Sequence, residues 1–224
     1  MGYKFQMTKI FTAPIFPTGV VAIADADRRY SEDFDKNNFE FDDKWDFVTK
    51  QRSNKFESVL DHPSLIDMKS WIVKTASQFL KETIKLKHKK LFITDSWINI
   101  NNKGGSQHRH NHRNSILSGV YYIRTREGHP KLEFHRMHPI DQYPYISLDE
   151  HYEYGNPLTT DTVGFPTNQD TMIMFPSQIY HSHPPITIDE ERINISWNAL
   201  VHFEDNVEDT PGAGKYTYRL KFEE

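Results

Sequence analysis

The stretch that decides the fold runs from residue 107 to residue 124 and reads Gln107-His-Arg-His-Asn-His-Arg-Asn-Ser-Ile-Leu-Ser-Gly-Val-Tyr-Tyr-Ile-Arg124. It opens with three histidines at alternate positions, His108, His110 and His112, and continues into an apolar run typical of a strand. Alternate side chains of an extended chain share a face, so two of these histidines can bind one metal ion, with a third ligand from another strand. The spacing fits the pair 108 and 110 as well as the pair 110 and 112.

The segments around this stretch predict more strands and one helix. Short runs rich in Ile, Val, Phe, Tyr and Trp, separated by Gly, Pro, Asn and Asp, predict strands at 91–101, 115–124, 131–135, 171–175, 191–203 and 215–222. Ahead of all of them, apolar residues recur every three or four positions from Leu65 to Leu86 and predict a helix over 64–87. One helix before many short strands is typical of an all-β sandwich or barrel with helical packing on its outside.

The length favours a single domain over residues 1–224, since domains hold roughly 100–200 residues. We expect 1–60 to be an N-terminal extension that packs on the barrel, 61–90 to supply the supporting helix and 91–204 to form the core. The connection at 136–170 is too long for an ordinary loop and carries four tyrosines. We interpret it either as a surface insertion or as a lid over a substrate.

The composition excludes several classes of protein. Twenty-seven Lys and Arg against 31 Asp and Glu give a formal net charge of −4, which argues against nucleic acid or an anionic membrane as a partner. The absence of cysteine excludes disulfides, iron–sulfur clusters and thiolate zinc sites, so a metal must be held by His, Asp or Glu. No run approaches the roughly 18 apolar residues of a membrane span, and the first residues lack an export signal. We expect a cytoplasmic protein.

Four segments together resemble the Fe(II)/2-oxoglutarate-dependent oxygenases of bacteria and phages. They are Ser96-Trp97, the run from His110-Asn-His112 to Ile123, Phe175-Pro-Ser177 with His181, and Arg192-Ile-Asn-Ile-Ser-Trp-Asn198. The resemblance covers about 95–200 in order and spacing. It implies a mainly β fold, the double-stranded β-helix or cupin-like jelly roll, with 91–204 as the jelly-roll core and the helix as its outer support.

The same resemblance implies an enzyme, a dioxygenase with Fe(II) as cofactor and 2-oxoglutarate and O2 as cosubstrates. Such an enzyme hydroxylates its substrate while 2-oxoglutarate is decarboxylated to succinate. The substrate is not identified by the sequence; a small molecule or a peptidyl residue fits the resemblance. No catalytic side chain beyond the metal centre is expected, because the metal performs the difficult chemistry.

The resemblance also assigns roles to single residues. His110 and His112 match the HxH pair of metal ligands, and His181 matches the distal histidine ligand. Arg192, eleven residues after His181, matches the residue that binds the far carboxylate of 2-oxoglutarate. Its planar guanidinium suits a carboxylate, which it can bind with two parallel hydrogen bonds.

Three further side chains are candidates for contacts around this centre. Tyr122 and Ser196 are expected to help bind 2-oxoglutarate. His135 ends a strand that leads to the mouth of the barrel, and we name it as a candidate substrate contact.

The metal ligands depart from the pattern of the wider superfamily. The usual triad is two histidines and one carboxylate with open positions, but no Asp or Glu stands between Asp95 and Glu127. Three neutral imidazoles would leave the full +2 charge of the ion for a doubly negative 2-oxoglutarate to neutralise. The sequence leaves open whether His108 replaces His112, and whether water or a carboxylate from elsewhere completes the site.

Two other functions fit part of the pattern. A cupin-type metal protein shares part of the histidine spacing. Because it does not use 2-oxoglutarate, it would not require Arg192 to bind a carboxylate. A non-catalytic, phage-like jelly-roll binding module could keep a histidine-rich surface, with the tyrosines of 136–170 as a contact surface.

Overall fold

The structure of the chain is a computed structural model that describes residues 21–41, 51–53, 58–136 and 160–203. The strand predicted at 215–222 lies outside the described residues, as do 1–20 and the greater part of the long connection with its four tyrosines.

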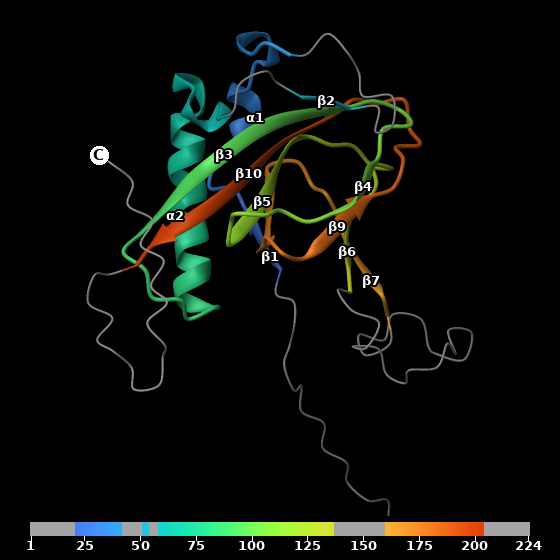
Figure 1. Cartoon of the computed structure of the whole chain (residues 1–224). Coiled ribbons are helices and arrows are strands. Elements are labelled where there is room, and N and C mark those ends of the chain that lie inside the picture. The colour runs from blue at the N-terminus through green and yellow to red at the C-terminus, as the bar shows by residue number, and fades with distance from the viewer. Residues whose placement is uncertain (1–20, 42–50, 54–57, 137–159, 204–224) are drawn as a thin grey trace, which may run out of the picture.

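A six-stranded antiparallel sheet forms the larger wall of the molecule (Figure 1). Its strands, in spatial order, are β1 (Ala22–Asp25), β8 (Thr171–Pro176), β5 (Leu117–Arg124), β10 (Arg192–His202), β3 (Lys90–Asn101) and β2 (Gln51–Ser53). β10, the strand predicted from Arg192 onward, lies between β3 and β5 and pairs with both. Strands that are distant in sequence are therefore neighbours in space, which is typical of a jelly roll.

A second, four-stranded antiparallel sheet faces the first (Figure 1). Its strands, in spatial order, are β4 (Gln107–His110), β9 (Tyr180–His183), β6 (Leu132–His135) and β7 (Thr162–Phe165). An apolar cluster joins the two sheets, with Val120, Tyr122 and Phe175 from the large sheet and Leu132 and Phe134 from the small one. The two sheets thus enclose an interior, which is the architecture predicted from the sequence.

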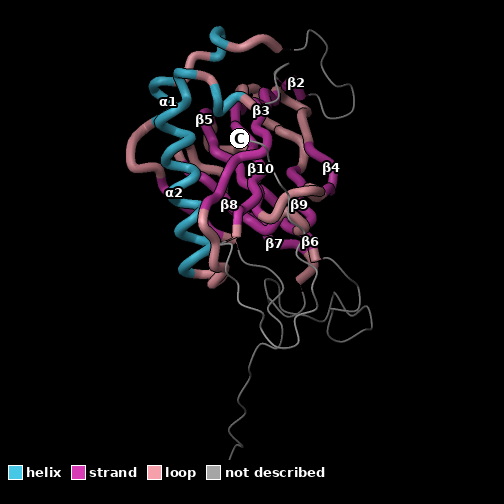
Figure 2. Tube along the Cα trace, turned by 60° about the vertical axis from the view of Figure 1, so that its left-hand side comes forward, coloured by secondary structure: helices cyan, strands magenta, loops and turns pink. Residues whose placement is uncertain are grey.

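Helix α2 (Ile66–Glu82) covers the outer face of the large sheet (Figure 2). Its buried residues Trp71, Ile72 and Phe79 pack in one apolar cluster with Ile98 of β3 and Ile195 of β10. This packing confirms the outer position predicted for the helix. The remaining helical segments are short: α1 (Tyr30–Asp33) and the 3-10 turns Lys36–Asn38, Val59–Asp61 and Pro63–Leu65. No helix in the described ranges is long and apolar enough to cross a membrane.

β10 is buried on both faces over its first eight residues, and alternation divides those faces by chemistry. Ile193, Ile195, Trp197 and Ala199 face the helix and belong to its apolar cluster. The intervening residues Asn194, Ser196 and Asn198 line a pocket between the sheets. One strand therefore supplies both the core that holds the helix and the polar wall of the site.

The predicted elements agree with the structure in place but not in every boundary. The helix predicted to reach residue 87 ends at Glu82, and soon afterwards Lys85 adopts a left-handed backbone with φ of 61°, which stops a helix. The sequence did not predict β2, β7 or β9, because these strands of three or four residues lack an apolar run. β7 and β9 both pair with β6, a pairing that only the folded chain supplies.

Gly119 of β5 tests the packing between the large sheet and the helix. It pairs with Trp197 of β10, and a Cβ at position 119 would lie 2.3 Å from Cζ2 of that fully buried indole. We predict that Gly119→Ala lowers the free energy of unfolding by about 1–3 kcal/mol, because the ring has no room to move in a packed core. Chemical denaturation measures the change. In a Trp197→Leu background the same substitution should cost clearly less, and an equal cost there would contradict this contact.

Candidate metal centre

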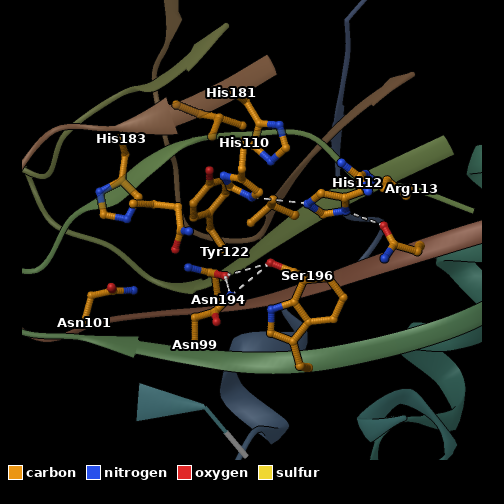
Figure 3. A pocket seen from close by; sticks show the side chains of 15 residues that line it. Asn99, Asn101, His110, His112, Arg113, Tyr122, His181, His183, Asn194 and Ser196 are labelled. Carbon is orange, nitrogen blue, oxygen red and sulfur yellow. Dashed lines mark hydrogen bonds between the residues drawn. The ribbon is translucent and has the colours of Figure 1, made fainter. Parts of the chain in front are cut away.

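Three histidines meet at one end of the interior, between the two sheets. His110 is the last residue of β4, His112 follows two residues later, and His181 lies on β9 directly opposite His110. Their ligand nitrogens all lie within 4.8 Å of one another, and Nε2 of His110 and Nε2 of His112 are 3.3 Å apart. Figure 3 shows the three rings turned toward one another. This is a donor set that can hold one divalent ion.

The hydrogen bonds at the opposite side of each ring leave its Nε2 free for a metal. Nδ1 of His110 donates to the carbonyl of His108 at 2.8 Å, and Nδ1 of His181 donates to the carbonyl of Ile179 at 3.0 Å. Because a carbonyl can only accept, the hydrogen of each ring is on Nδ1. Nδ1 of His112 is bonded to Oδ1 of Asn198 at 2.5 Å. Such outer partners orient metal-binding imidazoles and fix their tautomers.

Burial favours the neutral form of two of these rings, His181 and His110. His181 is 4% exposed, and loss of hydration, followed by its closeness to His110, lowers its pKa to about 3. Loss of hydration also lowers the pKa of His110. A metal needs the unprotonated ring, so the site is prepared for a cation before one arrives.

The local backbone explains how a short polar strand can place these rings. Gln107 pairs with His183 and His110 pairs with His181, so β4 holds one more residue than β9 between the two pairs. Such bulges redirect side chains and are frequent beside active sites. Beyond the end of β4, the N–H of His112 donates to the carbonyl of Ser177 at 2.9 Å, which holds the third ring in place.

A pocket of about 300 Å³ extends from the histidines between the sheets. In Figure 3, His112 and Arg113 lie toward one side of it, and His183 and Asn101 lie toward the other. Its walls are mostly amide, hydroxyl and imidazole side chains, and none of the described residues that line it is a carboxylate.

Arg192 lies buried beside the part of the pocket away from His112. It is 2% exposed, and neither its Nε nor its Nη1 has a hydrogen-bond partner among the described residues. Its charge acts on Tyr122 and His183, which line the pocket. A buried guanidinium without a counter-charge is costly, so the arrangement favours binding of an anion there.

Asn101 adds to this end of the pocket, and the sequence analysis missed it. It pairs with Arg192 across β3 and β10, is fully buried, and leaves both amide atoms without a partner among the described residues. The alternation of Trp97-Ile-Asn-Ile-Asn101 was the available signal, because it predicts that residues 97, 99 and 101 share the face opposite Ile98 and Ile100.

Between the histidines and Arg192, polar side chains form the wall of the pocket. Ser196, named from the sequence, lies here with Asn99 and Asn194. The amide of Asn99 donates to Oδ1 of Asn194 and to Oγ of Ser196, both at 3.0 Å. Burial raises the pKa of the Tyr122 hydroxyl to about 12, so it remains protonated and able to donate.

The structure keeps two of the sequence-based candidates apart from this cluster. His108 is exposed, so of the two histidine pairs the structure brings 110 and 112 to His181. His135 does not line the pocket: its ring is bonded to Ser182 at 2.7 Å and to Thr162 at 3.1 Å. The neighbouring Phe134 points to the interior, so alternation places His135 on the opposite face of the sheet.

Comparisons with known proteins agree with this geometry. Residues 95–198 match the family described as "Putative 2OG-Fe(II) oxygenase". No curated protein matches the chain in sequence.

Solved structures share the fold over most of the chain. HygX from Streptomyces hygroscopicus with nickel and 2-oxoglutarate bound has 9% identity and a TM-score of 0.57, over 84% of this chain and 85% of that chain. An oxidoreductase of the 2OG-Fe(II) oxygenase family from Burkholderia pseudomallei has 13% identity and a TM-score of 0.51, over 75% and 74%. A Pseudomonas putida prolyl-4-hydroxylase has 8% identity and a TM-score of 0.52, over 82% and 94%. They confirm the predicted double-stranded β-helix.

The metal-binding set can be tested without any substrate. We predict that the chain binds one Co(II), used as a stable substitute for Fe(II), and that His112→Ala and His181→Ala each raise its dissociation constant more than about 10-fold. Isothermal titration measures the constants. His108→Ala is the matched control, because it removes an exposed imidazole from β4, the strand that carries His110, and should leave the affinity unchanged. A loss of affinity in His108→Ala that equals the loss in His112→Ala would contradict this assignment.

Proposed function

We propose that His110, His112 and His181 bind Fe(II) and that Arg192 anchors 2-oxoglutarate, since residues 95–198 match the family described as "Putative 2OG-Fe(II) oxygenase". The observation that carries this proposal is the convergence of three imidazoles on a pocket beside a buried guanidinium, whose Nε and Nη1 have no partner among the described residues. The reaction is hydroxylation of a small-molecule or peptidyl substrate.

The residues fit the groups that this reaction requires. The bound iron supplies the activation of O2, by which a C–H bond of the substrate becomes C–OH while 2-oxoglutarate becomes succinate and CO2. The protein's part is to bind, to orient and to exclude water. Phe134 and Phe175 serve the last purpose, since their rings lie beside His181 with centroids 6.3 and 4.6 Å from its ring.

The charges favour a doubly negative cosubstrate. Three neutral imidazoles leave the +2 charge of the ion uncompensated, and Arg192 adds a positive charge that no described carboxylate pairs within the pocket. 2-Oxoglutarate carries one carboxylate for each of these positive centres. Binding should therefore remove two unfavourable charges from the interior at the same time.

The far carboxylate has suitable donors around it. Arg192 offers a planar guanidinium, which can form two parallel hydrogen bonds with a carboxylate, and its Nε and Nη1 have no hydrogen-bond partner among the described residues. Asn101 offers an amide, and the protonated Tyr122 offers a hydroxyl from the neighbouring strand β5. Ser196 lies between these donors and the metal centre, on the same face of β10 as Arg192.

The substrate should approach beside His112. Trp97 is half-buried there, with its ring centroid 5.7 Å from that of His112. Arg113, which follows His112 in the sequence, is exposed and also lines the pocket. An aromatic ring and a guanidinium can recognise either a small molecule or a side chain of a peptide.

Turnover without a known substrate tests the reaction. We predict that the protein with Fe(II), ascorbate and 2-oxoglutarate forms succinate slowly, and that His181→Ala abolishes this formation because the metal is lost. Succinate is measured by chromatography or a coupled assay. Unchanged succinate formation by His181→Ala would exclude the proposed centre.

Replacing Arg192 separates this function from a cupin-type one. We predict that Arg192→Met weakens 2-oxoglutarate binding to the Co(II)-loaded protein by about 10- to 100-fold, since charge-assisted hydrogen bonds contribute about 1.5–3 kcal/mol. Co(II) affinity should not change. Without ligand, the variant should be at least as stable as the wild type in chemical denaturation, because an unpaired buried charge has been removed. Equal 2-oxoglutarate affinity in both proteins would favour the cupin alternative.

A further inference from the structure

The amide of Asn198 lies between a carboxylate and one of the three histidines. Nδ2 of Asn198 donates to Oδ2 of Asp95 at 2.8 Å, and Oδ1 of Asn198 is 2.5 Å from Nδ1 of His112. The chain of contacts therefore runs from Asp95 through one amide to one imidazole. Asp95 and Asn198 face each other in the pairing of β3 with β10, although they are 103 positions apart.

These contacts determine where the protons are. A carboxylate can only accept hydrogen bonds, so the NH2 end of the Asn198 amide must face Asp95. Its oxygen must then face His112, and an oxygen can only accept, so Nδ1 of His112 carries the hydrogen. Nε2 of His112 is consequently the bare nitrogen, and it is the one that lies 3.3 Å from Nε2 of His110.

A hydroxyl reinforces this orientation of the amide. Oγ of the fully buried Ser118 donates to Oδ1 of Asn198 at 2.7 Å, on the same oxygen that accepts from His112. Both lone pairs of that oxygen are then used, and rotating the amide by half a turn would place its oxygen against the Asp95 carboxylate, where neither group can donate.

A bulge in β3 places the carboxylate. Asn198 pairs with Asp95 but the next residue, Ala199, pairs with Ile93, so Thr94 is left without an opposite residue. The hydroxyl of Thr94 donates to Oδ1 of Asp95 at 2.7 Å, while Oδ2 remains directed at Asn198. Bulges commonly redirect a side chain beside a functional site.

We propose that Asp95 and Asn198 are positioning residues that act through His112 and take the place of the carboxylate ligand that this metal centre lacks. The negative charge of Asp95 reaches the metal through one amide and one imidazole. The tautomers of His110 and His181 are fixed by backbone carbonyls, so His112 is the one of the three whose tautomer depends on replaceable side chains. The inference rests on the proposed role of His112 as a ligand.

The sharpest variant is Asp95→Asn, which keeps the shape of the side chain. An amide both donates and accepts, so Asn198 is free to turn its NH2 end to His112, which then carries its hydrogen on Nε2 and cannot bind metal with it. We expect the dissociation constant for Co(II) to rise about 10- to 100-fold, the range seen when outer partners of metal ligands are removed. Asn198→Ala should act in the same direction.

Asp67→Asn is the matched control, because it makes the same chemical change on the exposed surface of α2, on the other side of the large sheet. Its Co(II) affinity should equal that of the wild type. Thermal unfolding of each variant separates a loss of positioning from a loss of fold, and if Asn198→Ala does not fold, Asp95→Asn alone decides.

A second measurement needs no metal. Long-range 1H–15N spectra of the metal-free protein report which ring nitrogen of each histidine carries the hydrogen. We expect the wild type to show His112 with its hydrogen on Nδ1, and Asp95→Asn to show a mixture of tautomers or the Nε2 form, with His110 and His181 unchanged. If Asp95→Asn keeps the wild-type tautomer or the wild-type Co(II) affinity, the inference is wrong. If the wild type binds no metal, the proposed function fails, while the tautomers still show whether Asp95 and Asn198 control His112.

Discussion

The antiparallel pairing of β4 with β9 is the constraint on which the rest of the site depends. It sets His110 opposite His181, and a slip of one residue would turn one of the two rings away from the interior. Hydrogen bonds beyond the strands hold the register: the N–H of Gly104 donates to the carbonyl of Ile186 at 2.7 Å, and the N–H of Ile186 donates to the carbonyl of Gly105 at 2.9 Å. Four-residue strands have few ladder bonds of their own, so these flanking bonds matter for the geometry of the metal centre.

The electrostatic character of the interior follows from which charges are absent. The described lining of the pocket contains imidazoles, amides and hydroxyls but no carboxylate, and the buried cation Arg192 lies beside it. A folded chain retains such an arrangement at a cost in stability, because buried charge without a partner is unfavourable. In the proposed function, a dianion and a divalent cation that bind together would offset this cost. Under the inference above, Asp95, which contacts Asn198 and through it His112, would be an indirect negative partner for the metal centre.

The large sheet does two tasks with the two faces of the same strands. Along β3 and β10, one face packs on α2 through Ile98, Ile195 and Trp197, and the other carries the polar side chains of the pocket. The helix is therefore part of what holds the site, although it contributes no residue to the pocket lining. Without a cover on that apolar face, the strands could not keep both faces buried.

The sequence alone determined the class of fold, the helix and the principal strands, because hydrophobic period and turn residues are local signals. It also supplied the histidines, Arg192 and the resemblance that named the family. It could not choose between His108 and His112, since both stand two residues from His110. The choice came from the point where β4 ends and from the bond between His112 and Ser177, which are tertiary facts.

Asp95 and Asn198 were beyond local reasoning for the same cause, and the alternation around Asn101 predicts its face but not its position opposite Arg192. Nothing near any of them in sequence states its partner, because the partners lie about a hundred positions away and meet only through the pairing of β3 with β10. Period and spacing are properties of a segment, and they fix which face of a strand a side chain takes. Long-range pairing and packing decide which strand faces come together to enclose a pocket. The binding site is that pocket.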